Sequence, residues 1–169
     1  MSSSDSGALM EQELVDFLTS HLAIHVAACS PQRHSTLVKA PGCRINAART
    51  QITVLVPRYQ SEALLRAVET TGKVAVVFCQ PETHRTIQLK GTDAVIGEAT
   101  DADRNMLGPY LKKLSERLAY YAVSEVYTHT LYGCDPNELV TITFTPESAF
   151  RQTPGQHAGD KIKLGAPLP

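Results

Sequence analysis

The sequence has no tryptophan, no long apolar segment and almost no net charge. Sixteen Lys and Arg residues against seventeen Asp and Glu give a formal net charge of −1, which argues against a protein held to nucleic acid by a broad basic surface. The longest uncharged run near the middle of the chain, residues 74–81, is far shorter than the roughly 20 apolar residues of a membrane-spanning helix. We therefore expect neither a nucleic acid nor a membrane as a partner.

Signals for metal binding, secretion and nucleotide binding are also missing. The four cysteines form no CxxC pair, and residues 1–7 lack the basic start and apolar stretch of a secretory signal. We therefore expect reduced, mostly buried thiols, no metal site and a cytoplasmic location. The absence of GxGxxG and GxxxxGK[ST] loops argues against a Rossmann domain or a P-loop NTPase.

What is present points to one globular domain. A chain of 169 residues with 43% hydrophobic and 20% charged residues can bury a substantial core. The Ser-rich residues 1–7 are predicted to be disordered, and the Gly- and Pro-rich residues 151–169 are predicted to form an extended C-terminal arm. The domain itself is expected over residues 8–150.

Alternating and compact apolar runs predict a mainly β domain with flanking helices. Helices are expected around Leu14 to Leu22, over residues 61–70 with Ser61 as N-cap, and from a cap at Asp101 or Asp103 to Tyr121. The segment 128–137 is ambiguous. Short strands joined by tight turns favour an antiparallel sheet or barrel. The strands are expected over residues 23–29, 35–39, 43–48, 51–56, 73–80, 83–96 and 139–144.

One stretch carries a family resemblance. Residues 72–91 contain a hydrophobic strand, a Pro-Glu turn and the pattern Thr83-x-Arg85 leading to Gly91, and a strand and a short helix precede them. This arrangement resembles the pyridoxamine 5′-phosphate oxidase-like family of flavin-binding split β-barrels over roughly residues 12–146. The resemblance implies a six-stranded antiparallel Greek-key split barrel of the FMN-binding type. It also implies a homodimer, with FMN in a groove between the subunits.

The sequence departs from true pyridoxamine phosphate oxidases at their ligand-binding motifs. The strand beginning at Cys43 carries Arg44 but lacks the family's terminal lysine. The stretch before the helix keeps only Arg58 and Ser61 of the Ser-Arg-Lys cluster, and without tryptophan there is no Trp-x-x-x-Arg substrate segment. We therefore expect a relative with a different substrate.

Two groups of residues are candidates for the site. Arg58 precedes a helix start, where free backbone N–H groups suit an anion, although an ordinary cap and a solvated arginine fit the same residues. The strand after Thr83 either lies along the flavin ring or simply faces water, and the direction of Arg44 depends on strand register. The resemblance implies FMN contacts from Arg44, Val56, Pro57, Arg58, Ser61, Thr83, His84, Arg85, Thr86 and Gln88.

These observations favour an FMN-binding flavoprotein, an oxidoreductase whose substrate the sequence does not identify. No nucleophile and base stand out as a catalytic pair in the sequence. Flavin chemistry belongs largely to the cofactor, so such a pair is not required. One alternative is a non-catalytic binding protein for haem or another planar or phosphorylated ligand. Another is a regulatory dimer with an empty groove. The visible spectrum of the purified protein distinguishes these hypotheses.

Overall fold

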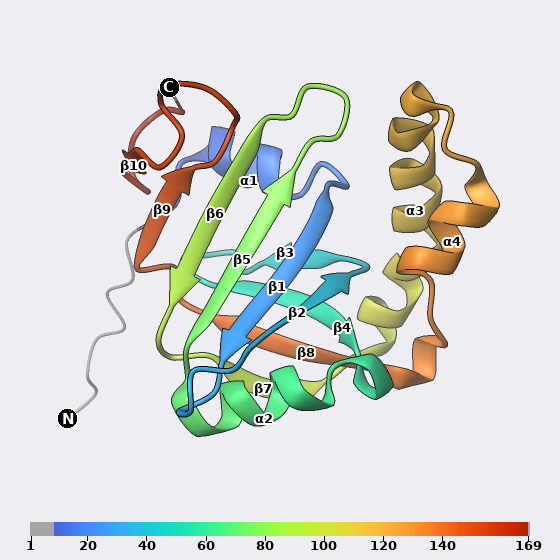
Figure 1. The fold of residues 1–169 in the computed structure, drawn as a ribbon, viewed down its shortest axis with the longest axis horizontal. Helices are drawn as coiled ribbons and strands as arrows, with labels where there is room; N and C mark the ends of the chain where they lie inside the picture. Colours follow the sequence, from blue (N-terminus) through green and yellow to red (C-terminus); the bar gives the residue numbers. More distant parts are fainter. Residues whose placement is uncertain (1–8, 169) are drawn as a thin grey trace.

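Two antiparallel sheets form the centre of the molecule (Figure 1). The structure, a computed structural model, describes residues 9–168, so the predicted disorder of residues 1–7 lies outside it. Within the described residues the chain forms ten strands. They are β1 (Ala23–Cys29), β2 (Ser35–Ala40), β3 (Cys43–Ile45), β4 (Ile52–Pro57), β5 (Val74–Cys79), β6 (Thr86–Gly91), β7 (Val95–Glu98), β8 (Leu139–Phe144), β9 (Ser148–Arg151) and β10 (Lys161–Ile162).

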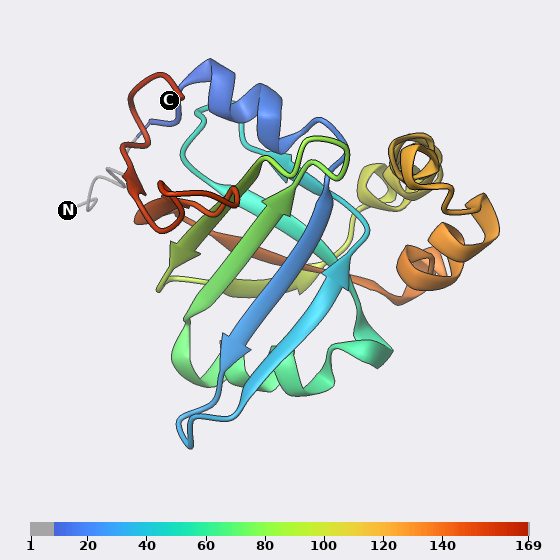
Figure 2. The same cartoon turned by 45° about the horizontal axis from the view of Figure 1, so that its top comes forward.

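The larger sheet has the order β10-β9-β6-β5-β1-β2. Its register sets Val26 opposite Val76, which in turn lies opposite Leu89, and all three side chains are fully buried. Because side chains alternate across a strand, this row lies on the inner face, and the residues between them form an outer face. No helix crosses that outer face, which Figure 2 shows from the front.

The smaller sheet has the order β3-β4-β8-β7 and lies behind the larger one in Figure 1. All six residues of β4 are buried, because the larger sheet covers one of its faces and helices lie at its ends. The core therefore lies between the sheets. It includes Phe78 from the larger sheet and Phe144 from the smaller, exposed by 0% and 1%.

Helices cover the edges of this two-sheet core. α2 lies along the lower end of the larger sheet, and α3 and α4 pack together beside β2 (Figures 1 and 2). α3 begins at a capping box: the Thr100 side chain accepts from the Asp103 backbone N–H, and the Asp103 side chain accepts from the Thr100 backbone N–H. None of the helices described is long and apolar enough to cross a membrane. The helical segments are α1 (Gln12–Leu18), η1 (Arg58–Gln60), α2 (Glu62–Thr71), α3 (Asp101–Leu118), η2 (Ala119–Tyr121), α4 (Glu125–Tyr132) and η3 (Pro136–Glu138).

The fold confirms the predicted antiparallel split-barrel class, as an open pair of sheets with ten strands where six were expected. The predicted strand over residues 83–96 is two strands, β6 and β7, which belong to different sheets. The chain turns between them because Gly91 lies against the other sheet. A Cβ at Gly91 would lie 2.7 Å from Phe144 Cδ2. The ambiguous segment contains most of α4, which begins at Glu125.

The C-terminal segment also differs from the extended arm that its composition predicted. The expected boundary after residue 150 falls within β9, which pairs with β6. β10 pairs with β9, and the side chains of Ile162 and Leu164 are each only 7% exposed. Residues 151–168 therefore fold back against the larger sheet, because these two apolar side chains provide anchors that the glycines and prolines around them obscure.

Candidate functional site

The junction of β4 and α2 contains four of the predicted FMN contacts. Val56 and Pro57 are buried at the end of β4, so only their backbone can reach a ligand. Arg58 is half-exposed, and its Nη2 lies 2.7 Å from Oε1 of Glu98. Ser61 precedes α2 and is fully buried, but its hydroxyl makes no capping hydrogen bond and has no partner among residues 9–168.

Arg44 lies on β3 and is held by a buried carboxylate. Its Nε donates to Oδ1 of Asp103 at 2.7 Å, and the Asp103 side chain is 0% exposed. Burial opposes the charge on Asp103, but hydrogen bonds from Arg44 and from Thr100 outweigh it and lower the pKa of that carboxyl below its ordinary value. The sequence left the direction of the Arg44 side chain open, and the structure shows that it points toward Asp103 of α3.

Beside Arg44 lies a pocket of about 650 Å³ between α1, β3 and α3. Its walls are mostly apolar, and His21 lies among them. Burial, aided by the charges of Arg117 and Lys113, lowers the pKa of His21, so its imidazole is neutral at pH 7. The other lining residues are Leu18, Thr19, Cys43, Ile45, Ala102, Asn105, Met106, Pro109 and Tyr110.

Arg44 and Arg58 each pair with an acid at one end of the segment that connects β7 to α3. Glu98, the last residue of β7, pairs with Arg58, and Asp103, in the first turn of α3, pairs with Arg44. Since only four residues separate the two acids, Arg58, the predicted phosphate ligand, and Arg44, a predicted FMN contact, pair with opposite ends of the β7–α3 connection.

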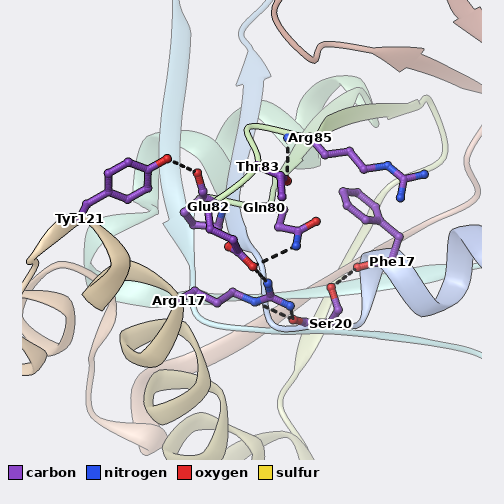
Figure 3. A network of polar contacts seen from close by, with 9 residues as sticks. Phe17, Ser20, Gln80, Glu82, Thr83, Arg85, Arg117 and Tyr121 are labelled. Atoms are coloured by element: carbon purple, nitrogen blue, oxygen red, sulfur yellow. Dashed lines mark hydrogen bonds and ion pairs between the residues drawn. The ribbon is translucent and has the colours of Figure 1, made fainter.

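The second group of predicted residues lies on the turn between β5 and β6, where a polar network fixes the backbone (Figure 3). Arg117, near the end of α3, donates to Glu82 Oε1 and at 2.8 Å to the backbone oxygen of Ser20. Burial disfavours the charged form of Glu82, but hydrogen bonds from Gln80 and the attraction of Arg117 outweigh it, and the pKa of Glu82 is lowered. Tyr121 donates to the backbone oxygen of Pro81 at 2.8 Å.

The predicted site residues of this turn point in different directions. His84 adopts a left-handed backbone, φ 58°, and its Nε2 lies 3.2 Å from the Tyr121 hydroxyl. The Arg85 guanidinium lies 4.9 Å from the centre of the Phe17 ring. Thr83 Oγ1 accepts from the Arg85 backbone at 3.2 Å. Gln88 is half-buried on the outer face of β6, whereas Thr86 is buried and donates to the His84 backbone oxygen.

A single protomer therefore does not gather all the predicted contacts. Arg44, Arg58 and Ser61 lie around the β7–α3 connection and the start of α2, while residues 83–88 lie at the turn at the opposite end of β5 (Figures 1 and 2). Within residues 9–168 no three His, Cys, Asp or Glu side chains gather as metal ligands.

The open antiparallel sheets and their helices define the split-barrel fold of pyridoxamine 5′-phosphate oxidase-like proteins. The structure is similar to HupZ of Group A Streptococcus, with a TM-score of 0.54 and 15% identity over 89% of this chain and 100% of that one. It is also similar to a Lactobacillus delbrueckii protein provisionally assigned as a pyridoxamine 5′-phosphate oxidase, with a TM-score of 0.51 and 11% identity over 83% and 93%. No protein-family model and no curated protein matches the sequence.

Sequence reasoning missed three side chains that the structure places at pockets. His21 follows a helix, Arg117 lies near the end of a long helix, and Arg151 ends a short strand. Each gives only an unremarkable local signal, because its partners are distant in sequence.

Proposed function

We propose that the protein is an FMN-binding homodimer, an oxidoreductase of unidentified substrate that acts in the cytoplasm. The flavin lies in a groove between the subunits. Its phosphate binds at the start of α2 of one subunit. The β5–β6 turn of the other subunit completes the site. The four unpaired cysteines are in keeping with a reducing compartment.

The observation that carries the proposal is the chemistry at the start of α2. The first backbone N–H groups of a helix have no intrahelical acceptor and carry partial positive charge, which favours an anion. Arg58 lies three residues before Ser61, the N-cap of α2, and the buried hydroxyl of Ser61 has no hydrogen-bond partner among residues 9–168. The helix start and these two residues, which are neighbours along the chain, support a phosphate at this position.

The carboxylate already on Arg58 does not exclude a phosphate. Arg58 and Glu98 have side chains that are 51% and 77% exposed, and an ion pair exposed to this extent contributes only about 0–1 kcal/mol. A phosphate with nearly two negative charges competes well for the same guanidinium. Arg44 is held more firmly, by the buried Asp103, and contributes to the wall of the adjoining pocket instead.

The outer face of the larger sheet supports the dimer. Ala27 lies between Leu37 and Ala75 in the register, and Val77 lies beside His25. Apart from His25 these side chains are small or apolar, all but the exposed Leu37 are half-buried within one chain, and no helix covers them (Figure 2). An uncovered face of this composition is typical of a surface that a partner covers.

When bound, FMN supplies the electron-transfer chemistry, and the chain supplies binding and orientation. Arg58 and the N–H groups of α2 neutralise the phosphate. The network of Arg117 and Glu82 holds the β5–β6 turn in one conformation, so that Thr83 and His84 present a fixed polar edge.

The test compares FMN with riboflavin, which lacks the phosphate. Arg58→Ala is expected to weaken FMN by roughly 1.5–3 kcal/mol, the range for a hydrogen bond to a charged group, and to leave riboflavin almost unchanged. Arg66→Ala is the matched control, since Arg66 is also an exposed, ion-paired arginine of the same region. Equal weakening of both flavins, or no weakening, contradicts the placement of the phosphate.

The pocket at His21 favours haem as a second candidate. A neutral imidazole in an apolar pocket can ligate iron, and the lowered pKa of His21 keeps it available at neutral pH. Haem addition is expected to give a Soret band that His21→Ala shifts or abolishes. Flavin bands with no Soret band support the FMN proposal instead.

A further inference from the structure

A second, separate pocket lies under the C-terminal segment. It has a volume of about 360 Å³, and β6, β9 and the loop after β9 form its walls. Two arginines, Arg85 and Arg151, line it together with Thr153 and His157 of the loop. The loop forms the curve beside β9 and β10 in Figure 1, at a distance from the start of α2.

Both arginines border this pocket, from two different elements. Arg151 is the last residue of β9 and lies directly opposite Ile87 of β6, so these two side chains share a face. Arg85 lies in the β5–β6 turn directly before β6 and lines the same pocket as Ile87 and Arg151.

Hydrogen bonds fix the walls of the pocket. The backbone N–H of Thr86 donates to Thr153 Oγ1 at 3.0 Å, and that of Gln152 donates to the Thr86 oxygen at 2.8 Å. The loop closes on the end of β9, where the N–H of Gly159 donates to the Arg151 oxygen at 2.7 Å. The loop is thus bound to the two strands that carry the arginines.

The charges in this pocket are incompletely paired. The Arg151 side chain is half-buried and makes no hydrogen bond or ion pair with any residue from 9 to 168. Arg85, whose side chain is 39% exposed, forms a loose ion pair with the exposed Glu13, with 3.8 Å between Nη2 and Oε1 and no hydrogen bond. The ring of Phe17 holds its guanidinium in place. The other acid here, Asp160, pairs with His157 at 3.0 Å.

We propose that this pocket binds a phosphate-type oxyanion between Arg85 and Arg151. Half-buried guanidinium groups gain most from a counter-charge, and a planar fork donates two parallel hydrogen bonds to phosphate oxygens. The oxyanion is either inorganic phosphate or the phosphate group of a larger molecule, FMN included. The inference does not rest on the proposed phosphate site at α2, which uses other residues.

The experiment titrates inorganic phosphate into the full chain by calorimetry at constant ionic strength. Saturable binding of one phosphate per chain is expected. Arg151→Gln is expected to weaken it roughly tenfold or more, as for a lost hydrogen bond between charged groups. Arg151→Lys, which keeps the charge without the fork, is expected to bind with intermediate affinity.

Lys161→Gln is the matched control, because it removes one positive charge from the exposed neighbouring strand β10. It is expected to bind phosphate like the unmodified protein. Circular dichroism confirms that each variant is folded. Absence of saturable phosphate binding by the unmodified protein, or equal affinities of Arg151→Gln and Lys161→Gln, overturns the proposal.

A flavin arm distinguishes the two sources of the oxyanion. If Arg151→Gln weakens phosphate and FMN but not riboflavin, the pocket holds the flavin phosphate. If it weakens phosphate alone, the pocket binds a different phosphate. Both results support the oxyanion pocket, and the separate Arg58→Ala titration decides whether the start of α2 binds FMN.

Discussion

The two faces of the larger sheet are made from the same strands but have opposite environments. On the inner face Val26, Val76 and Leu89 are fully buried against the smaller sheet. On the outer face Ala27 and Val77, their immediate neighbours in sequence, remain accessible, with no helix over them. One face thus completes its packing within the chain, and the other does not.

We therefore expect the inner face to determine the stability of one protomer and the outer face to determine the association of two. A substitution on the inner face changes the free energy of unfolding of one protomer, because the core is packed at near-crystalline density. A substitution on the outer face is expected to change the association of protomers and not their stability. The following predictions test this separation, from the largest expected effect on protomer stability to the smallest.

The C-terminal segment is expected to be part of the inner-face core. Changing Ile162 and Leu164 together to alanine is expected to lower the free energy of unfolding by roughly 4–6 kcal/mol, since each buried side chain leaves a cavity. Urea unfolding measures this change. Lys163→Ala, between them and exposed, is the control and is expected to cost less than about 0.5 kcal/mol. An unchanged midpoint for the double variant indicates a dispensable arm.

Gly91 tests how closely the two sheets approach. A Cβ there would lie 2.7 Å from Phe144 Cδ2 and 2.8 Å from the Thr145 oxygen, so Gly91→Ala is expected to cost about 2–3 kcal/mol through overpacking. Gly108→Ala is the contrasting variant. No atom lies within 4 Å of its added Cβ, and it is expected to stabilise α3 by roughly 0.5–1 kcal/mol. Thermal unfolding of both variants measures the contrast, and equal effects contradict it.

Much of this fold was predictable from the sequence because local signals and the final packing agree. β4, β5 and β8 are compact apolar runs, and α2 ends at Gly72 as its capping pattern predicts. The break between β6 and β7 was not predicted, although Gly91, Thr92 and Asp93 interrupt the alternation, because the pattern does not say which sheet a residue joins. Its causes are tertiary: Gly91 lies against Phe144 of the other sheet, and Asp93 accepts from the Thr145 backbone at 2.8 Å.

The candidate site was less predictable than the fold. The sequence identified Arg58 and the start of α2, which are neighbours along the chain. It did not identify the carboxylate on Arg44, since Asp103 is distant in sequence and looks like an ordinary helix cap. Arg151 was hidden for a related reason: only the pairing of β9 with β6 places it beside Arg85.

Asp103 tests a charge buried at the edge of the core. Asp103→Asn is expected to cost about 1.5–3 kcal/mol at pH 7, because hydrogen bonds from Arg44 and Thr100 lose their charged acceptor. The lowered pKa means that the carboxylate stabilises the fold above its ordinary value of 3.8, and that this contribution is lost as the pH falls through the folded-state pKa.

Urea unfolding of the protein and of Asp103→Asn at pH 7, 4 and 3 measures this dependence. The two stabilities are expected to converge as the pH falls below about 4. Asp101, exposed in the same helix turn, provides the control Asp101→Asn, for which little change is expected. A difference for Asp103→Asn that does not narrow at all between pH 4 and pH 3 shows that packing, not charge, explains the loss.

The outer face is expected to control association and to contribute little to protomer stability. Ala27→Arg adds a charge at the centre of the row formed by Leu37, Ala27 and Ala75. In a dimer that covers this row, an unpaired buried charge costs about 2–5 kcal/mol and raises the dissociation constant roughly a hundredfold or more. In the separate protomer the long side chain reaches water, and the change in unfolding free energy is expected to stay within about 0.5 kcal/mol. Sedimentation at micromolar concentration measures the dissociation constant, and urea unfolding of dilute protein measures the unfolding free energy.

Val95→Arg is the control. It places the same charge on an exposed apolar residue of β7, in the smaller sheet, and is expected to leave the dimer intact. A monomeric unmodified protein, or a dimer that tolerates Ala27→Arg as well as Val95→Arg, shows that the outer face is not the interface.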